Sequence, residues 1–290
     1  METPANRDPG ASPDAIQRHY DVGYDFYRLW LDTSLTYSCA LWEPNDTLES
    51  AQQRKLDYHI GQARAAGADH VLDVGCGWGS ALRRLVDGHG VRKATGLSLS
   101  RDQVQRIKAL DDRRIEARLE SWCDHEPARP YDAIISMGAF EHFVKPHLPR
   151  AEKIEAYRMF FERCHEWLKT DGWFSLQTLA YENKSEDVPG QFSENVILPE
   201  SDAPRLAEIA RAGEGLFEVV GLRNDREQYE RTCREWLSRL KANRGKALDL
   251  VGSAVIARYE TFLKLAIVGF HTGMISLLRI TLRRVPARQS

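Results

Sequence analysis

The segment Val71–Ser80, VLDVGCGWGS, constrains the fold more than any other part of this chain. An apolar, β-branched run ends at Asp73, and glycines follow at the alternate positions 75, 77 and 79. Such a run is typical of a buried parallel strand, and residues 80–86 (SALRRLV) favour a helix directly after the turn. The glycines allow positive φ angles and let a ligand approach the backbone closely. The pattern predicts a nucleotide-type site at the carboxyl end of a first strand.

The spacing of these glycines narrows the class of ligand. It is GxGxG, which differs from the GxGxxG of dinucleotide sites and from the GxxxxGK[ST] of phosphate loops. The acid at the strand end would repel a pyrophosphate, but it can hold the amine of an amino-acid moiety. The turn therefore indicates S-adenosylmethionine and a methyltransferase. The alternative is a tight turn in an unrelated α/β protein.

Composition and charge exclude several other classes of protein. The length of 290 residues suits one large α/β domain, and a net charge of −2 provides no global basic field for nucleic acid. The cysteines are odd in number, scattered and without a CxxC pair, which argues against a disulfide scaffold or a zinc site and favours a reducing cytoplasm. Residues 1–12 lack an apolar core, so we expect a disordered lead-in rather than a signal peptide.

Strand and helix patterns alternate after residue 69. This order predicts a doubly wound, mostly parallel sheet. Near the C-terminus, Leu278, Ile280 and Leu282 alternate with polar residues, which predicts a half-buried edge strand after a helix that ends near Gly273. The expected strands cover residues 71–74, 93–99, 115–119, 132–137, 173–179, 217–222 and 278–282, and the expected helices cover residues 80–86, 101–110, 153–168, 205–211, 229–240 and 252–268.

Two regions outside this alternation are expected to flank the site. Residues 13–68 contain two helical stretches, the first capped by Ser12-Pro13 and continuing through residues 24–31, and the second over 50–66. We interpret them as a helical cap over the cofactor cleft. Residues 180–205 are polar and proline-rich, which is typical of a lid or acceptor-specific insertion, although a surface loop without a role is the alternative. Residues 13–290 are expected to form a single domain.

Several motifs carry a resemblance to a known family. They are HYDVGYDFYRLWLDTSLTYSCALW (19–42), VLDVGCGWGS with GLSLSRDQ (96–103), and SMGAFEHF (136–143). Together they resemble the cyclopropane fatty acid synthases, including the mycolic acid cyclopropane synthases. The resemblance extends through QYERTCREW (228–236), covers nearly the whole chain, and is weakest in 180–205. It implies a Rossmann-like class I methyltransferase fold, with a seven-stranded sheet and an antiparallel last strand.

The resemblance also implies where S-adenosylmethionine binds. The second strand ends in ATGLSLS, without the acid that binds the ribose in many methyltransferases, but the amide of Gln103 can bond to hydroxyl groups. Trp122 matches a tryptophan beside the adenine, although alone it would indicate a core aromatic residue. The residues expected to bind this cofactor are Tyr37, Ser38, Asp73, Gly75, Gly77, Trp78, Leu97, Ser98, Gln103, Ser121, Trp122 and Met137.

The implied reaction is alkylation of a carbon–carbon double bond by a sulfonium methyl group. The resulting carbocation needs a water-free pocket, aromatic or negative surroundings, and a base. In the family the base is a bound bicarbonate, held by a cysteine, a backbone amide, a glutamate, a histidine and a tyrosine. Cys39, Met137, Glu141 and Tyr229 match four of these positions. Cys39 has an alternative interpretation as a small core residue.

The chain departs from the family at the histidine. The matching position in GWFSLQTLA is Gln177, which can donate a hydrogen bond but cannot pass on a proton near neutral pH. Either a bicarbonate site persists with altered proton handling, or Glu141 itself is the base. We expect His142 to be structural, and the run at 123–126 (CDHE) to be a turn rather than a metal site.

Three functions remain open on the sequence. The first is cyclopropane synthase-like transfer to an unsaturated acyl lipid, which predicts a long apolar tunnel beside Glu141. The second is a natural-product C- or N-methyltransferase with a small acceptor, favoured by Gln177 and a short polar insertion. The third is a non-catalytic S-adenosylmethionine-binding protein. A lipid acceptor would be presented by a membrane or a carrier protein, and the arginines at 279, 283, 284 and 288 favour an anionic surface, unless they form a solvated strand edge and tail.

Overall fold

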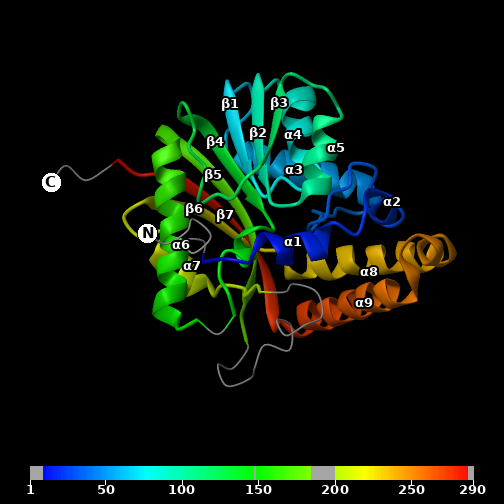
Figure 1. Cartoon of the computed structure of the whole chain (residues 1–290). Helices are drawn as coiled ribbons and strands as arrows, with labels where there is room; N and C mark the ends of the chain where they lie inside the picture. The colour runs from blue at the N-terminus through cyan, green and yellow to red at the C-terminus, as the bar shows by residue number, and fades with distance from the viewer. Residues whose placement is uncertain (1–8, 147, 184–199, 287–290) are drawn as a thin grey trace.

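A seven-stranded sheet forms the centre of the computed structural model, which describes residues 9–146, 148–183 and 200–286 (Figure 1). Its strand order is β3-β2-β1-β4-β5-β7-β6, and β7 runs antiparallel to both of its neighbours. The predicted doubly wound sheet with an antiparallel last strand is confirmed. The strands are β1 (His70–Val74), β2 (Lys93–Ser98), β3 (Ile115–Leu119), β4 (Tyr131–Met137), β5 (Leu168–Tyr181), β6 (Phe217–Asn224) and β7 (Ile275–Arg284).

Helices cover both faces of the sheet, because alternate side chains of each strand point to opposite faces. In β1, Val71 packs in a cluster with Ile60 and Leu82 on one face, whereas Leu72 packs with Phe160 on the other. The first face is covered by α3 (Leu48–Gln62), α4 (Ser80–Arg83) with its π-helical extension η2 (Arg84–Gly88), and α5 (Arg101–Lys108), and the second by α6 (Arg150–Trp167) and α7 (Leu206–Ala212).

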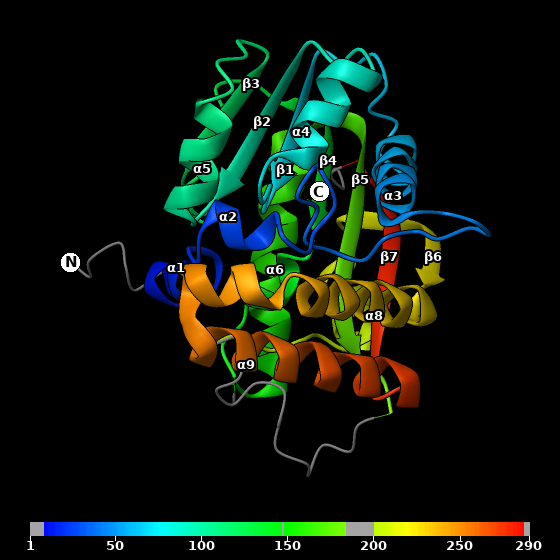
Figure 2. The same ribbon diagram turned by 90° about the vertical axis from the view of Figure 1, so that its right-hand side faces the viewer.

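Four helices lie at the end of the sheet where the parallel strands finish. Figures 1 and 2 show α8 (Arg226–Ala242) and α9 (Arg244–Thr272) side by side below this end, with α1 (Pro13–Tyr20) and α2 (Tyr24–Tyr27) beside them. The predicted start of α1 is confirmed, since the Ser12 side chain accepts a hydrogen bond from the backbone N–H of Ala15. No helix in the described ranges is long and apolar enough to cross a membrane.

The predicted continuation of the first helix through residues 24–31 is wrong. The helix stops at Tyr20, and α2 has only four residues. Gly23 adopts a φ of 108° between them, a conformation that an α-helix does not contain. The aromatic residues that follow pack onto α9 instead, where the Tyr27 and Tyr259 hydroxyls lie 2.7 Å apart. Aromatic packing against a distant helix has overridden the local helical spacing.

The prediction of an edge strand at residues 278–282 is also wrong. β7 lies between β5 and β6 and is buried on both faces. Arg279 is only 1% exposed, because its guanidinium Nε binds Asp225 Oδ2 at 2.7 Å. Arg279 therefore does not belong to a basic surface at the C-terminus. The expected lead-in (1–12) and insertion (180–205) lie largely outside the described residues, which exclude 1–8 and 184–199.

Candidate active site

The glycine turn after β1 has the backbone conformation that its sequence predicts. Gly75 and Gly77 have φ angles of 84° and 52°. A Cβ atom on Gly75 would lie 2.3 Å from the Cβ of Ala139, so only glycine permits this close approach to the turn after β4. A Cβ atom on Gly77 would meet no atom within 4 Å, which leaves that side of the turn open to a ligand.

A large pocket lies over this turn at the carboxyl ends of the strands. It encloses about 980 Å³ of empty space, part of it open to solvent, and every residue predicted to bind S-adenosylmethionine lines it. Several further residues of its wall were not among those predicted to bind the cofactor. These are Ala11, Ile16 and Tyr20 at the N-terminus, Lys55 of α3, and His142 with Phe143 after β4.

Asp73 gives this pocket an acidic group with one unpaired oxygen atom. Its side chain is 1% exposed, and its Oδ1 atom has no hydrogen-bond partner among the described residues. Burial raises the pKa of Asp73 to about 7, although the nearby Lys55 acts in the opposite direction. A buried carboxylate without a partner is unfavourable. Asp73 is therefore suited to an ammonium group, and the pocket fits the amino-acid end of S-adenosylmethionine.

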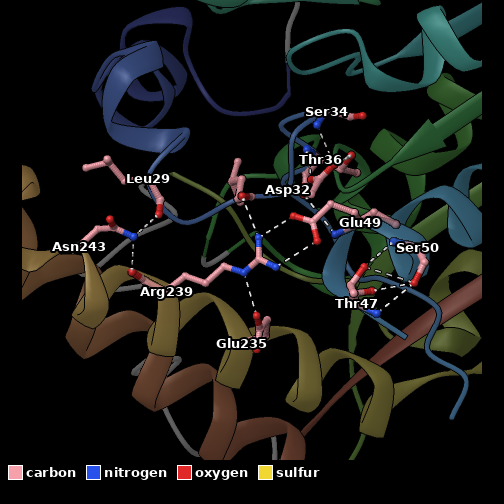
Figure 3. A network of polar contacts seen from close by, with 12 residues as sticks. Leu29, Asp32, Ser34, Thr36, Thr47, Glu49, Ser50, Glu235, Arg239 and Asn243 are labelled. Atoms are coloured by element: carbon pink, nitrogen blue, oxygen red, sulfur yellow. Dashed lines mark hydrogen bonds and ion pairs between the residues drawn. The ribbon is translucent and has the colours of Figure 1, made fainter. Parts of the chain in front are cut away.

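The loop that carries Tyr37 and Ser38 is held in place by a polar network (Figure 3). The Asp32 carboxylate accepts hydrogen bonds from two backbone N–H groups of this loop, at 2.7 and 2.9 Å. Arg239 of α8 binds both carboxylate oxygens of Glu49 in α3, at 2.7 and 3.1 Å. These contacts join the two helices around the loop, and they fix one wall of the pocket.

Glu141 lies in η3 (Phe140–His142), the turn that follows β4. Burial raises the pKa of Glu141 to about 7, and its Oε2 atom accepts a hydrogen bond from Thr178 Oγ1 at 3.1 Å. A Cβ atom on Gly138 would lie 3.8 Å from Glu141 Oε1 and 3.9 Å from the Cβ of Ser38. The carboxyl group is thus close to the pocket that contains Ser38.

A second cavity, of about 620 Å³ including its solvent-open part, is lined by Glu141, which is not part of the lining of the first pocket. Tyr229 of α8 shares it with Glu141, and burial raises the pKa of its hydroxyl well above the usual value. Ser201 and Asp202, near the C-terminal end of the predicted insertion (180–205), also line it. The rest of the wall is mainly apolar and is formed by Leu179, Tyr181, Ala203, Cys233, Phe262, Ala266, Phe270 and Ile275.

Cys39 and Gln177 line neither of these two cavities. Cys39 is fully buried, and burial raises the pKa of its thiol to about 12. The Gln177 side chain lies against α3, with its Oε1 atom 3.2 Å from His59 Nε2. Of the groups predicted to hold a base, the structure brings Glu141 and Tyr229 to the second cavity, Met137 lines the first pocket, and Cys39 and Gln177 line neither.

Two buried residues, whose positions the sequence patterns do not reveal, connect Cys39 to Gln177. Arg279 lies 3.3 Å from the Cys39 carbonyl oxygen through Nη2 and 3.2 Å from His59 Nε2 through Nη1. The guanidinium can only donate, so this nitrogen of His59 must accept. Burial lowers the pKa of His59 well below its usual value, so the ring is neutral and its Nδ1–H group faces Ser175 Oγ at 2.8 Å. Alternating polarity in β7 gave no signal for this arrangement.

His142 connects the two sides of the site. Its Nε2 atom lies 3.1 Å from the Tyr20 hydroxyl, and its Nδ1 atom lies 2.6 Å from Ser201 Oγ. Burial lowers the pKa of His142 to about 4, so the ring is neutral near pH 7. The backbone N–H of Asp202 also donates to the Glu141 carbonyl oxygen at 3.2 Å. These contacts hold the Glu141 turn between α1 and the described end of the predicted insertion.

Comparison with known proteins gives a consistent result. The family model of mycolic acid cyclopropane synthetase matches residues 9–280. Cyclopropane mycolic acid synthase 3 of Mycobacterium tuberculosis is 31% identical over 288 residues, which cover 93% of this chain and 96% of the relative. Cyclopropane mycolic acid synthase 2 of Mycobacterium leprae is 32% identical over 275 residues, covering 86% of this chain and 87% of the relative.

Solved structures agree with the sequence relatives. The crystal structure of mycolic acid cyclopropane synthase CmaA1 complexed with SAH and CTAB has a TM-score of 0.85 at 30% identity, and covers 95% of this chain and 99% of its own. The cyclopropane synthase MmaA2 from Mycobacterium tuberculosis has a TM-score of 0.86 at 29% identity, and the match covers 96% of this chain and 100% of MmaA2. Coclaurine N-methyltransferase shares the fold, with a TM-score of 0.79 at 21% identity. This match covers 97% of this chain and 84% of the other.

Proposed function

The chain belongs to the mycolic acid cyclopropane synthetase family of S-adenosylmethionine-dependent methyltransferases, and on this premise we propose that it alkylates a carbon–carbon double bond in an unsaturated acyl chain. The observation that carries the acyl acceptor is the apolar second cavity beside Glu141. A small polar acceptor would leave this lining unmatched, whereas an acyl chain buries its methylene groups against it.

The two cavities divide the reaction between donor and acceptor. In the first pocket, Asp73 would pair with the ammonium group of S-adenosylmethionine, which supplies an electrophilic methyl group. The double bond would enter from the second cavity and attack that methyl group. The sulfur–methyl bond would break, S-adenosylhomocysteine would be released, and a cationic carbon would remain on the acyl chain. Tyr229 and Phe270 offer aromatic surfaces there, and the apolar wall limits the access of water that would trap the cation.

We assign the final deprotonation to Glu141. Its pKa of about 7 is suited to a base near neutral pH, and it lines the acceptor cavity. When the carboxylate takes a proton from the newly delivered methyl group, the remaining electron pair closes the cyclopropane ring on the cationic carbon. Cys39 and Gln177 do not line this cavity, and Gln177 lies against His59, which supports this carboxylate over a bicarbonate held by those residues.

The experiment follows the acceptor by mass spectrometry. The enzyme and S-adenosylmethionine are incubated with vesicles of an unsaturated phospholipid or with an unsaturated acyl carrier protein, and matched saturated substrates are the control. We expect the unsaturated acyl chain to gain one CH₂ unit. A gain on an amine or heteroaromatic compound, without a gain on any acyl chain, would instead establish the small-acceptor methyltransferase.

The same assay tests the base. We expect Glu141→Gln to lower turnover by about 10²-fold or more, while the affinity for S-adenosylhomocysteine measured by calorimetry stays nearly unchanged. We also expect the wild-type rate to persist after removal of dissolved carbon dioxide. A rate that falls on this removal and returns on addition of bicarbonate would contradict the assignment to Glu141.

A further inference from the structure

Lys55 is a buried cation that the proposed reaction does not yet use. Its side chain is 0% exposed on the inner face of α3 and lines the donor pocket. The Nζ atom donates to Ser38 Oγ at 2.8 Å and lies 3.7 Å from Met137 Sδ. Both of these partners are neutral, and Lys55 forms no ion pair with any described residue. A buried ammonium group with only neutral partners is unfavourable, so its position calls for an anion.

The charges around Lys55 do not supply that anion at contact distance. Burial lowers the pKa of Lys55 to about 7, and the positive charge of Arg279 acts in the same direction. Asp32, Cys39 and Asp73 act in the opposite direction, but only through longer-range attraction. The Asp32 carboxylate is already occupied by backbone N–H groups of its own loop. The Lys55 charge is therefore available for a ligand.

Asp73 is the complement of Lys55 in the same pocket. It carries a buried oxygen without a partner among the described residues, and Lys55 carries a buried cation without a carboxylate partner. One ligand that brings both an ammonium group and a carboxylate would satisfy the two together. The amino-acid end of S-adenosylmethionine has these two groups on one carbon atom, so the pair matches its zwitterion.

We propose that Lys55, acting with Ser38, binds the α-carboxylate of S-adenosylmethionine while Asp73 binds its ammonium group. Ser38 Oγ accepts a hydrogen bond from Lys55, which leaves the hydroxyl hydrogen of Ser38 to donate to the carboxylate. The assignment rests on the proposed function, because it identifies how that enzyme would recognise its methyl donor. It explains why the lysine is kept inside a pocket where burial is costly.

The test combines a lysine variant with a series of truncated ligands. Calorimetry measures the affinities of wild type and Lys55→Met for S-adenosylhomocysteine, for its decarboxylated analogue, which keeps the amine, and for 5′-methylthioadenosine, which has neither group. We expect Lys55→Met to weaken S-adenosylhomocysteine binding by between about 10-fold and 100-fold, as for loss of a hydrogen bond to a charged group. The other two ligands should bind both proteins almost equally.

Lys108→Met is the matched control, since Lys108 is an exposed residue of α5 outside the pocket lining. It should change none of the three affinities. An equal loss for all three ligands in Lys55→Met would show that the lysine only supports the structure, and no loss for S-adenosylhomocysteine would also overturn the proposal. If wild type itself failed to bind S-adenosylhomocysteine, the proposed function would fail as well.

A measurement on wild type alone keeps the proposal testable if the variant does not fold. The ratio of the affinities for S-adenosylhomocysteine and its decarboxylated analogue isolates the carboxylate, because both ligands carry the amine that faces Asp73. With a pKa of about 7, Lys55 loses its proton in the free protein as the pH rises above 7. We expect the ratio to fall by up to about ten-fold per pH unit between pH 7 and 8.5. A constant ratio over this range would overturn the assignment.

Discussion

Glu141 is a buried carboxyl group whose protonation affects the stability of the whole fold. Burial disfavours the charged form and raises the pKa of Glu141 from its ordinary value of 4.5 to about 7. The folded state therefore holds this proton more tightly than the unfolded state does. The resulting contribution to stability is complete below about pH 4.5 and is lost as the pH rises through 7, with a size on the order of 3 kcal/mol.

The variant Glu141→Gln removes this titration while keeping the shape of the side chain. We expect the variant to gain stability relative to wild type by about 2–3 kcal/mol when the pH is raised from 5 to 8. Urea denaturation at the two pH values measures the difference. The variant Glu155→Gln is a control at an exposed residue of α6 that lines neither cavity. If the difference in free energy of unfolding between wild type and Glu141→Gln were the same at pH 5 and pH 8, a raised pKa at Glu141 would be contradicted.

Gln177 takes on a different meaning once its neighbours are known. Its Oε1 atom and Arg279 Nη1 both lie 3.2 Å from the same nitrogen of His59. That nitrogen cannot donate to the amide oxygen and accept from the guanidinium at the same time, so Gln177 and Arg279 compete for it. The departure from the family histidine is therefore part of a buried polar cluster between β5, α3 and β7, rather than an isolated exchange in the acceptor cavity.

At the scale of elements, the ion pair of Arg279 and Asp225 joins β7 to the start of α8. Arg279 is 1% exposed and Asp225 is 7% exposed, and the backbone N–H of Tyr229 donates to the Asp225 carbonyl oxygen at 3.2 Å. The pair therefore fixes the helix turn that presents Tyr229 to the acceptor cavity. Removing one partner of such a pair leaves an uncompensated charge in the interior.

We expect Asp225→Asn to lower the free energy of unfolding by about 3–5 kcal/mol, because it leaves Arg279 without its carboxylate. Denaturant titration measures the loss. The double variant Asp225→Asn/Arg279→Met should recover part of it, since it removes both charges from the interior. The exposed pair of Arg28 and Asp25 provides a control, in which Asp25→Asn should change stability by less than about 1 kcal/mol. A similar small effect at Asp225 would show that the buried pair does not hold β7 to α8.

Local sequence patterns correctly predicted the turns and helix ends that depend on neighbouring residues. They failed where contacts with a residue distant in the chain determine the position of an element. The glycine turn at Gly75 and the helix start at Ser12 depend on neighbouring residues, and both occur as expected. The position of β7 depends on Asp225, which lies 54 residues away from Arg279 in the chain. The burial of Lys55 also depends on a distant segment. A lysine on a helix by itself indicates a solvated face, and it is the loop with Ser38 that contacts this one. The sequence thus predicted the residues that line the donor pocket on the cofactor side, but it did not predict the buried charges of Lys55 and Arg279.

At the scale of the whole molecule, α1 connects the donor pocket to the acceptor side. Ala11, Ile16 and Tyr20 line the donor pocket. The Gln17 amide donates to the Leu99 carbonyl oxygen at 3.2 Å, and the Tyr20 hydroxyl lies 3.1 Å from His142 Nε2. Through these contacts α1 lies across the gap between the end of β2 and the turn that carries Glu141. The helix is short, so its stability depends on the surfaces that it covers rather than on its own hydrogen bonds.

This arrangement predicts that α1 opens only when the donor leaves. If local unfolding of α1 exposes the pocket and releases the ligand, then S-adenosylhomocysteine at 100 times its Kd stabilises the closed form by about 2.7 kcal/mol. The hydrogen-bonded amide hydrogens of residues 16–20 should therefore exchange about 100-fold more slowly in the complex than in the free protein. Hydrogen–deuterium exchange with mass spectrometry measures this, and α7, which contributes no residue to the donor pocket, is the internal control. Unchanged exchange in α1, together with a ligand-dependent rise in Tm, would show that α1 opens while the donor stays bound.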